Sequence, residues 1–181
     1  MRIAVTGGIA EGKSTVMRYL RELGQETASA DEIARQVFLL PEVQAEIAEA
    51  VGLLLPLDPA AVRERISSSP DARRQVNAVT HPRILARIEG CPATWVEVPL
   101  LFEACLQGRF DRVWVATCGA EEQLRRLRER LGDEDGARRL IATQLPTEVK
   151  LAFADEIVRT IGSEPAVKSF VEQGIERELS N

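Results

Sequence analysis

Residues 7–15 combine glycines, a lysine and two hydroxyl side chains at a spacing suited to holding phosphate. They read GGIAEGKST and match the pattern G-x-x-x-x-G-K-[ST]. Glycines let such a loop curl until backbone N–H groups point at phosphate oxygens, while the following helix aims its N-terminus at the same anion. Lys13 is then expected to reach the β- and γ-phosphates, and the Ser14 hydroxyl to coordinate Mg²⁺. The predicted nucleotide-binding residues are Gly8, Ala10, Glu11, Gly12, Lys13, Ser14 and Thr15.

The alternative for this segment is an ordinary glycine-rich turn between a strand and a helix. Residues 2–6 predict a short buried strand, and residues 13–23 have apolar positions that recur at helical spacing. A position between a strand and a helix is the context in which the motif binds phosphate. Phosphate binding is therefore favoured over the plain turn.

Two side chains in this loop need a particular geometry if the loop is to hold a polyphosphate. A carboxylate at Glu11 that pointed inward would repel phosphate severely in a low-dielectric pocket. We therefore expect Glu11 to point to water, where screening leaves little cost. Ala10 is tolerable in this loop only if its φ is negative, because its Cβ disfavours the left-handed region that glycine tolerates.

Strands alternate with helices along the chain, which predicts an α/β fold with a parallel sheet covered on both faces. The expected strands are residues 2–6, 26–30, 93–98, 112–117 and 155–161. The expected helices are residues 13–23, 31–38, 121–131, 134–144, a short one around 150, and 164–179. Residues 41–89 are mostly helical, with breaks near 56–59 and at 70, and Pro82 is expected to kink or restart its helix. This stretch is too long for one crossover and predicts a subdomain at the carboxyl end of the sheet, where ligands bind.

Composition and charge exclude several classes of function. The 181 residues are 45% hydrophobic and 28% charged, which is ordinary for a globular protein, and the net charge of −5 disfavours sequence-independent nucleic-acid binding. No apolar run is long enough to span a bilayer. Three widely spaced cysteines form no zinc or disulfide framework and indicate a reducing cytoplasm. Asparagine occurs only at positions 77 and 181, so the N-K-x-D motif of guanine-specific proteins is absent and a small-molecule kinase is favoured.

Short islands of sequence, in order along nearly the whole chain, resemble the dephospho-coenzyme A kinase family. They are TGGI at 6–9, GKST at 12–15, ADEIAR at 30–35, HPRI at 81–84, PLLFE at 99–103, residues 123–130, QLP at 144–146 with Lys150, and residues 154–155. The phosphate loop alone is generic, whereas the D-x-I-A-R, H-P-x-I and P-L-L-F-E islands together are specific. The resemblance implies transfer of the ATP γ-phosphate to the 3′-hydroxyl of dephospho-coenzyme A, the last step of coenzyme A biosynthesis.

The same resemblance implies a body in three parts. Residues 1–38, 91–120 and 151–181 would form a three-layer P-loop kinase core, residues 39–90 a helical acceptor-binding subdomain, and residues 121–150 a small helical lid. ATP and Mg²⁺ are the implied cofactors, and dephospho-coenzyme A is the implied small-molecule substrate. We further expect no nucleic-acid or membrane partner, a cytoplasmic location, and a monomer or weak homo-oligomer.

Asp31 is the predicted catalytic base. It follows the second expected strand at the carboxyl end of the sheet, where a carboxylate can accept the proton of the attacking hydroxyl. The alternative is an N-cap of the helix that begins there, and the resemblance favours the base. Arg35, one helical turn further on, either holds an acceptor phosphate or is a solvated helix charge.

Three further residues are candidates for contacts to the acceptor or to a metal. His81, the only histidine, is interpreted as a polar contact to the acceptor, with a helix-cap or core histidine as the alternative. Glu97 ends the third expected strand, where a second acidic residue would hold Mg²⁺ directly or through water; a strand-edge charge is equally consistent. Glu103 either touches the acceptor or caps the segment that follows it.

Arginines on the expected lid helices supply cations that can close on ATP. Arg126 and Arg130 share one helical face, and Arg138 and Arg139 lie on the next helix. Interleaved acidic residues allow many of these arginines to form surface pairs instead. Arg130 matches the family's lid arginine and is the residue predicted to stabilise charge on the transferred phosphoryl group.

The chain departs from the family pattern at several positions. Ala10-Glu11 replace the usual Gly-Ser, Ser29 replaces an aspartate, Pro59 replaces an arginine, and Arg159-Thr160 replace an Asp-Asn pair near the adenine site. These departures leave two alternatives open. One is a kinase for another nucleoside or nucleotide, and the other is an ATP-binding module that has lost catalysis.

Overall fold

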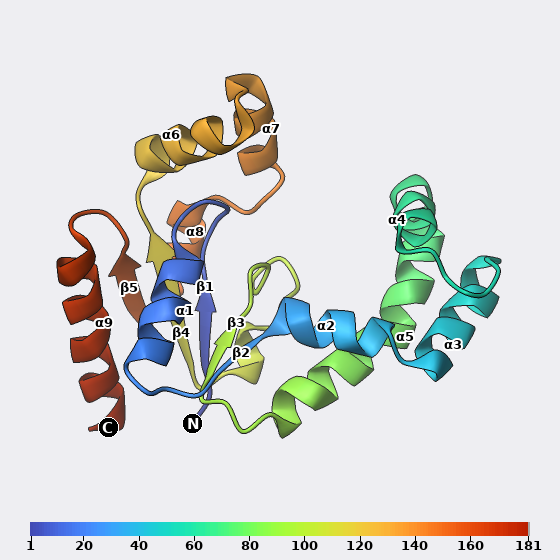
Figure 1. The fold of residues 1–181 in the computed structure, drawn as a ribbon, viewed down its shortest axis with the longest axis horizontal. Helices are drawn as coiled ribbons and strands as arrows, with labels where there is room; N and C mark the ends of the chain where they lie inside the picture. The colour runs from blue at the N-terminus through green and yellow to red at the C-terminus, as the bar shows by residue number, and fades with distance from the viewer. Residues whose placement is uncertain (181) are drawn as a thin grey trace. The chain divides into compact units, whose positions relative to one another are not determined.

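The computed structural model describes residues 1–180, which divide into two compact units (Figure 1). One unit is made of Met1–Ser29 with residues 92–180, and the other of Ala30–Cys91. The first unit holds strands β1 (Ile3–Thr6), β2 (Thr27–Ser29), β3 (Trp95–Glu97), β4 (Arg112–Thr117) and β5 (Glu156–Arg159). Its helices are α1 (Lys13–Glu22), α6 (Ala120–Leu131), α7 (Glu134–Ala142), α8 (Thr147–Leu151) and α9 (Glu164–Leu179), with a short 3₁₀ turn at Gln107–Arg109.

The five strands form one parallel sheet in the order β2-β3-β1-β4-β5. The predicted parallel α/β architecture is therefore confirmed. Because β1 lies in the middle, the loop that follows it emerges at the centre of the sheet's carboxyl edge. That edge is where α/β folds bind their ligands.

Both faces of the sheet are buried, as expected for parallel strands. On one face, Ile3 and Val5 of β1 and Trp114 of β4 pack with α1 and α9, which also pack against each other (Figure 1). The alternate residues Ala4 and Val115 point to the other face and are completely buried as well. The strands therefore carry nearly continuous apolar runs.

The second unit is helical and consists of α2 (Ala30–Phe38), α3 (Pro41–Val51), α4 (Pro59–Ser68) and α5 (Pro70–Gly90). Each of α3, α4 and α5 begins with a proline, whose fixed φ and missing N–H suit the first helical position. Asp58 and Ser69 then cap α4 and α5 through their side chains. Pro82 lies inside α5, which continues through it and does not restart.

Helix α2 belongs to the helical unit, although its residues were expected in the nucleotide-binding part. Val37 is completely buried in the core of this unit, and Ile33 and Phe38 pack against that core. The boundary between the units therefore lies directly after β2. None of the helices within residues 1–180 is long and apolar enough to cross a membrane.

Gly174 of α9 lies where a side chain would collide with the Trp114 ring, so Gly174→Ala should destabilise the protein. We expect the free energy of unfolding to fall by about 1–3 kcal/mol, the usual cost of overpacking a core. Gly90→Ala, at an open position, is the matched control and should not be destabilising. Equal denaturant midpoints for the two variants would contradict this account.

Candidate active site

The loop between β1 and α1 has the strained backbone that a phosphate-binding loop needs. Gly12 adopts a φ of +90° and is the N-cap of α1. No side chain caps that helix end, and its first turn contains no acidic residue. A Cβ at Gly12 would lie 2.6 Å from Thr160 Oγ1, so only glycine fits against this neighbour. The helix dipole and first-turn amides are thus directed at the loop, and no side chain of the first helical turn compensates them.

Lys13 and Ser14 open helix α1 directly after the turn. Lys13 Nζ donates to the carbonyl oxygens of Gly7, at 3.0 Å, and Gly8, at 2.8 Å, so its ammonium lies over the loop. Ser14 is exposed. The lysine and the serine hydroxyl are therefore both placed beside the same curl of backbone.

Ala10 has a φ of +60°, so the negative φ thought necessary for an alanine here is not observed, and that requirement was wrong. The chain must turn left-handed at this position to bring α1 over the end of β1, whichever residue occupies it. For an alanine this conformation costs roughly 1–2 kcal/mol. The loop carries that strain because its neighbours hold it on several sides.

Glu11 points inward and is completely buried, so the expectation of a solvent-facing carboxylate was also wrong. Its Oε2 accepts hydrogen bonds from Gly8 N–H (2.6 Å) and Thr147 Oγ1 (2.8 Å), and its Oε1 accepts one from Thr117 Oγ1 (3.1 Å). Three donors replace the water that the carboxylate loses. The Gly8 N–H, predicted to face phosphate, is bonded to Glu11 in this conformation.

Arg130 is the arginine of the expected lid that remains without a carboxylate partner among residues 1–180. The other lid arginines all form ion pairs with acidic neighbours: Arg125 with Glu122 and Glu129, Arg126 with Glu122, Arg128 and Arg138 with Glu134, and Arg139 with Asp133. Hydrogen bonds from Arg125, and then from Arg126, lower the pKa of Glu122 to about 2. Arg130 is exposed on α6 and keeps its charge available for a ligand.

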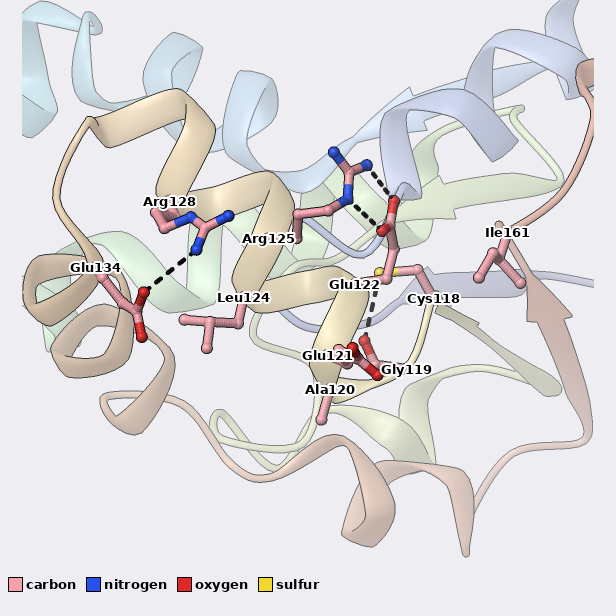
Figure 2. Close-up of a pocket in the computed structure, with 10 residues that line it drawn as sticks. All are labelled: Cys118, Gly119, Ala120, Glu121, Glu122, Leu124, Arg125, Arg128, Glu134 and Ile161. Carbon is pink, nitrogen blue, oxygen red and sulfur yellow. Dashed lines mark hydrogen bonds and ion pairs between the residues drawn. The ribbon is translucent and has the colours of Figure 1, made fainter.

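Two pockets flank the start of α6. Figure 2 shows the first, of about 590 Å³, with the Arg125–Glu122 and Arg128–Glu134 pairs along its wall and Ile161 opposite. The second, of about 510 Å³, is lined by Gly8 and Glu11 of the loop and by the segment 141–148. Cys118 lines both pockets, and burial raises the pKa of its thiol although Arg126 opposes this. These volumes are in the usual range for small-molecule sites.

Glu97 lies at the carboxyl end of β3, beside the phosphate loop. It is half-buried and is in register with Val5 of β1 on one side and Ser29 of β2 on the other. Within residues 1–180 no group of three or more His, Cys, Asp or Glu side chains forms a preassembled metal cluster. A metal ion at this position would therefore take most of its ligands from water or from a bound phosphate, and not from protein side chains.

The predicted residues Asp31, Arg35 and His81 all lie in the helical unit and are all exposed. Helix α2 begins at Ala30, so Asp31 is inside its first turn and the N-cap alternative was wrong. Arg35 forms a 3.1 Å ion pair with Glu32, consistent with a solvated helix charge. His81 lies on the exposed side of α5, so it is neither a cap nor a core residue.

Glu103 forms an ion pair with Lys150, a residue for which the sequence analysis assigned no role. Lys150 Nζ lies 2.8 Å from Glu103 Oε1 and is completely buried, and Leu145 N–H donates to the same oxygen at 2.9 Å. Burial by itself would raise the pKa of Glu103, but the Lys150 ammonium and backbone N–H groups outweigh it and hold the pKa below 4.5. Glu103 therefore anchors a segment far along the chain and does not cap the one that follows it.

The sequence analysis also missed the contacts of several residues that hold the loop. They are Thr117, Gln123, Gln144, Thr147 and Thr160. Threonines and glutamines are common on surfaces, and the contact of these five with the loop is visible only in the tertiary structure. Gln123, Gln144 and Lys150 did fall within the family-like islands, which was their only signal.

Glu103→Gln should lower the free energy of unfolding at neutral pH by about 1–3 kcal/mol, because it weakens a bond to a buried ammonium. A lowered pKa in the folded state means that the stabilisation is present above 4.5 and is lost as the pH falls below that value. The stability gap between wild type and variant should therefore shrink as the pH falls below 4.5. Glu148→Gln, an exposed change on the same helix as Lys150, is the control for denaturant titrations at each pH. A gap that stays constant with pH would contradict the assignment.

Comparison with known proteins confirms the resemblance suggested by the sequence islands. Residues 1–165 match the family model described as dephospho-CoA kinase. A dephospho-CoA kinase from Geobacter metallireducens is 38% identical over 89% of this chain and 88% of its own length. Among solved structures, a Thermus thermophilus protein matches with a TM-score of 0.77 and 27% identity, covering 99% of this chain and 96% of its own. The dephospho-CoA kinase from Campylobacter jejuni matches with a TM-score of 0.65 and 25% identity, covering 97% and 96%.

Proposed function

Because this chain belongs to the dephospho-CoA kinase family, we propose that it transfers the γ-phosphate of ATP to the 3′-hydroxyl of the dephospho-CoA ribose. The proposal rests on the family match over residues 1–165, joined to a phosphate loop whose backbone is already curled. Phosphoryl transfer of this kind depends mainly on positioning and charge stabilisation. Each candidate residue is therefore assigned one of those two tasks or proton acceptance.

The phosphate loop has the task of positioning ATP. Lys13 would exchange its bonds to the Gly7 and Gly8 carbonyls for phosphate oxygens, which carry full charge and bind an ammonium more strongly. The amides at the start of α1 would hold the same anion. Gly12 and Ala10 adopt left-handed backbone conformations, which give the loop its curl.

The oxygen donors near the loop are of the type that Mg²⁺ prefers. The Ser14 hydroxyl and the Glu97 carboxylate would hold the ion, directly or through water, together with phosphate oxygens. A bound Mg²⁺ would neutralise part of the triphosphate charge. Mg²⁺ usually keeps several water ligands and needs only one or two protein oxygens, so the Ser14 hydroxyl and the Glu97 carboxylate suffice without a preassembled cluster.

Asp31 is assigned the role of base and Arg130 that of the lid cation. An exposed carboxylate in the first turn of α2, two residues beyond β2, is free to accept the proton of the ribose hydroxyl. Arg130 would stabilise the charge on the moving phosphoryl group. Arg35, His81 and Glu103 remain proposed contacts to dephospho-CoA, and residues 39–90 the proposed acceptor-binding part.

Incubation with ATP, Mg²⁺ and dephospho-CoA, followed by mass spectrometry, tests the proposal directly. The expected product is dephospho-CoA with one added phosphate on the ribose. Transfer to a nucleoside or nucleotide, with none to dephospho-CoA, would replace the proposed acceptor. ATP binding by calorimetry with no transfer at all would indicate a module without catalysis.

Asp31→Asn should lower kcat by about 10²- to 10⁴-fold, the usual contribution of a general base, while ATP affinity is unchanged. The substitution keeps the shape of the side chain but cannot accept a proton. Glu42→Gln, also an exposed acid in a first helical turn of the same unit, is the control and should keep wild-type kcat. Full activity of Asp31→Asn in steady-state kinetics would remove Asp31 as the base.

Arg130→Ala should lower kcat by about 10²- to 10³-fold, because a charge that acts on the transition state is lost. Arg139→Ala removes a lid arginine that is already paired with Asp133 and should have little effect. Steady-state rates at saturating ATP compare the two variants. Equal losses would show that the positive charge of the lid, and not Arg130 in particular, matters.

A further inference from the structure

Glu11 is a completely buried carboxylate inside a loop that has to attract anions. None of the ion pairs within residues 1–180 includes it, and the nearby Lys13 Nζ donates to the Gly7 and Gly8 carbonyls. A buried ion without a counter-ion costs several kcal/mol unless hydrogen bonds compensate. The three donors around Glu11 must therefore supply that compensation together.

These three donors come from three different parts of the first unit. Gly8 N–H belongs to the loop itself, and Thr117 is the last residue of β4. Thr147 is the first residue of α8, at the point where the chain returns from the lid helices α6 and α7. The carboxylate thus joins the loop to the sheet and to the return of the lid.

Two glutamines make parallel connections between the same parts. Gln123 Nε2 of α6 donates to the Ile9 carbonyl at 2.9 Å, and Ile9 N–H donates to Gln144 Oε1 at 2.8 Å. The loop is therefore bonded both to α6, where the lid segment begins, and to the residues after α7, where it ends. Of these connections, only the Thr147 bond ends on a buried charge.

We propose that Glu11 is a positioning residue that couples the shape of the phosphate loop to the lid through Thr147. If Thr147 moves away, the buried carboxylate loses one of its donors, which raises the free energy of that arrangement. The carboxylate therefore favours an arrangement in which Thr147 stays docked on the loop and the loop keeps its curled form. This inference rests on the proposed function only in taking ATP as the ligand of the loop.

Four variants separate the charge of Glu11 from its connections. In Glu11→Gln the amide oxygen can still accept from Gly8 N–H and Thr147, while its NH₂ donates to Thr117 Oγ1. Glu11→Ala removes every connection, and Thr147→Val removes only the bond to the lid. Thr143→Val is the matched control, since the Thr143 hydroxyl bonds to Leu140 within the lid and not to the loop.

Hydrogen exchange of the full chain without ligand tests the coupling directly. Glu11→Ala and Thr147→Val should each speed exchange at least about fivefold both in residues 8–12 and in residues 141–151. Glu11→Gln and Thr143→Val should match wild type in both segments. Faster exchange confined to the segment that carries the substitution would overturn the proposal.

The kinetics of ATP use supply a second measurement: a change in KM for ATP at nearly constant kcat, which a general loss of structure would not produce. Glu11→Ala and Thr147→Val should each raise KM for ATP by about 5- to 10-fold with little change in kcat. The double variant should be no worse than Glu11→Ala, and Glu11→Gln should restore most of the affinity. Additive effects of the two single changes, or a Thr147→Val that behaves like Thr143→Val, would refute the coupling.

These outcomes can be told apart from a failure of the proposed reaction. If no phosphate reaches dephospho-CoA, the dissociation constant of ATP from calorimetry replaces KM in the same comparison. The exchange measurement needs neither substrate. Should Glu11→Ala fail to fold, Thr147→Val, Glu11→Gln and Thr143→Val still decide between coupled and independent segments.

Discussion

A left-handed turn directly after the central strand is the constraint on which the rest of the site depends. Ala10 and Gly12 both have positive φ, and this curl brings the start of α1 to the carboxyl edge of the sheet. Positive φ is costly for alanine, so surrounding contacts have to hold it. Thr160, which packs on Gly12 and donates to the Glu11 carbonyl at 2.7 Å, is one of them.

Two carboxylates, the partly exposed Glu103 and the buried Glu11, hold residues 145–150 on this unit, and their charges are compensated in different ways. Glu103 is matched by the buried ammonium of Lys150, so opposite charges compensate each other. Glu11 is matched by one amide and two hydroxyls, so dipoles compensate a charge. Dipolar compensation leaves a net negative charge in the loop, which cationic compensation would not. Glu11 is also the anchor that lies within the phosphate loop itself.

The helices and strands of the fold were predictable because the apolar patterns that define them are local in sequence. Residues 112–117 and 164–179 form a strand and a helix with the expected bounds. A continuous run of β-branched and aromatic residues defines the strand, and buried residues at helical spacing define the helix. The phosphate loop was equally predictable, because its glycine and lysine spacing follows from the shape of a phosphate group. The role of Arg130 was favoured by resemblance, and the ion pairs of its neighbours add a physical reason for that choice.

Burial and partners could not be predicted, because they depend on residues distant in sequence. Glu11 looked like a surface carboxylate until Thr117 and Thr147, more than a hundred positions away, were found around it. The packing of α2 with the helical unit likewise depends on Val37 meeting apolar residues of other helices. By itself the sequence determined the parallel α/β fold, the phosphate loop and the family, all of which rest on spacing along the chain. Only the tertiary structure decided which charges are buried and what compensates them, since desolvation and hydrogen bonding are set by neighbours in space.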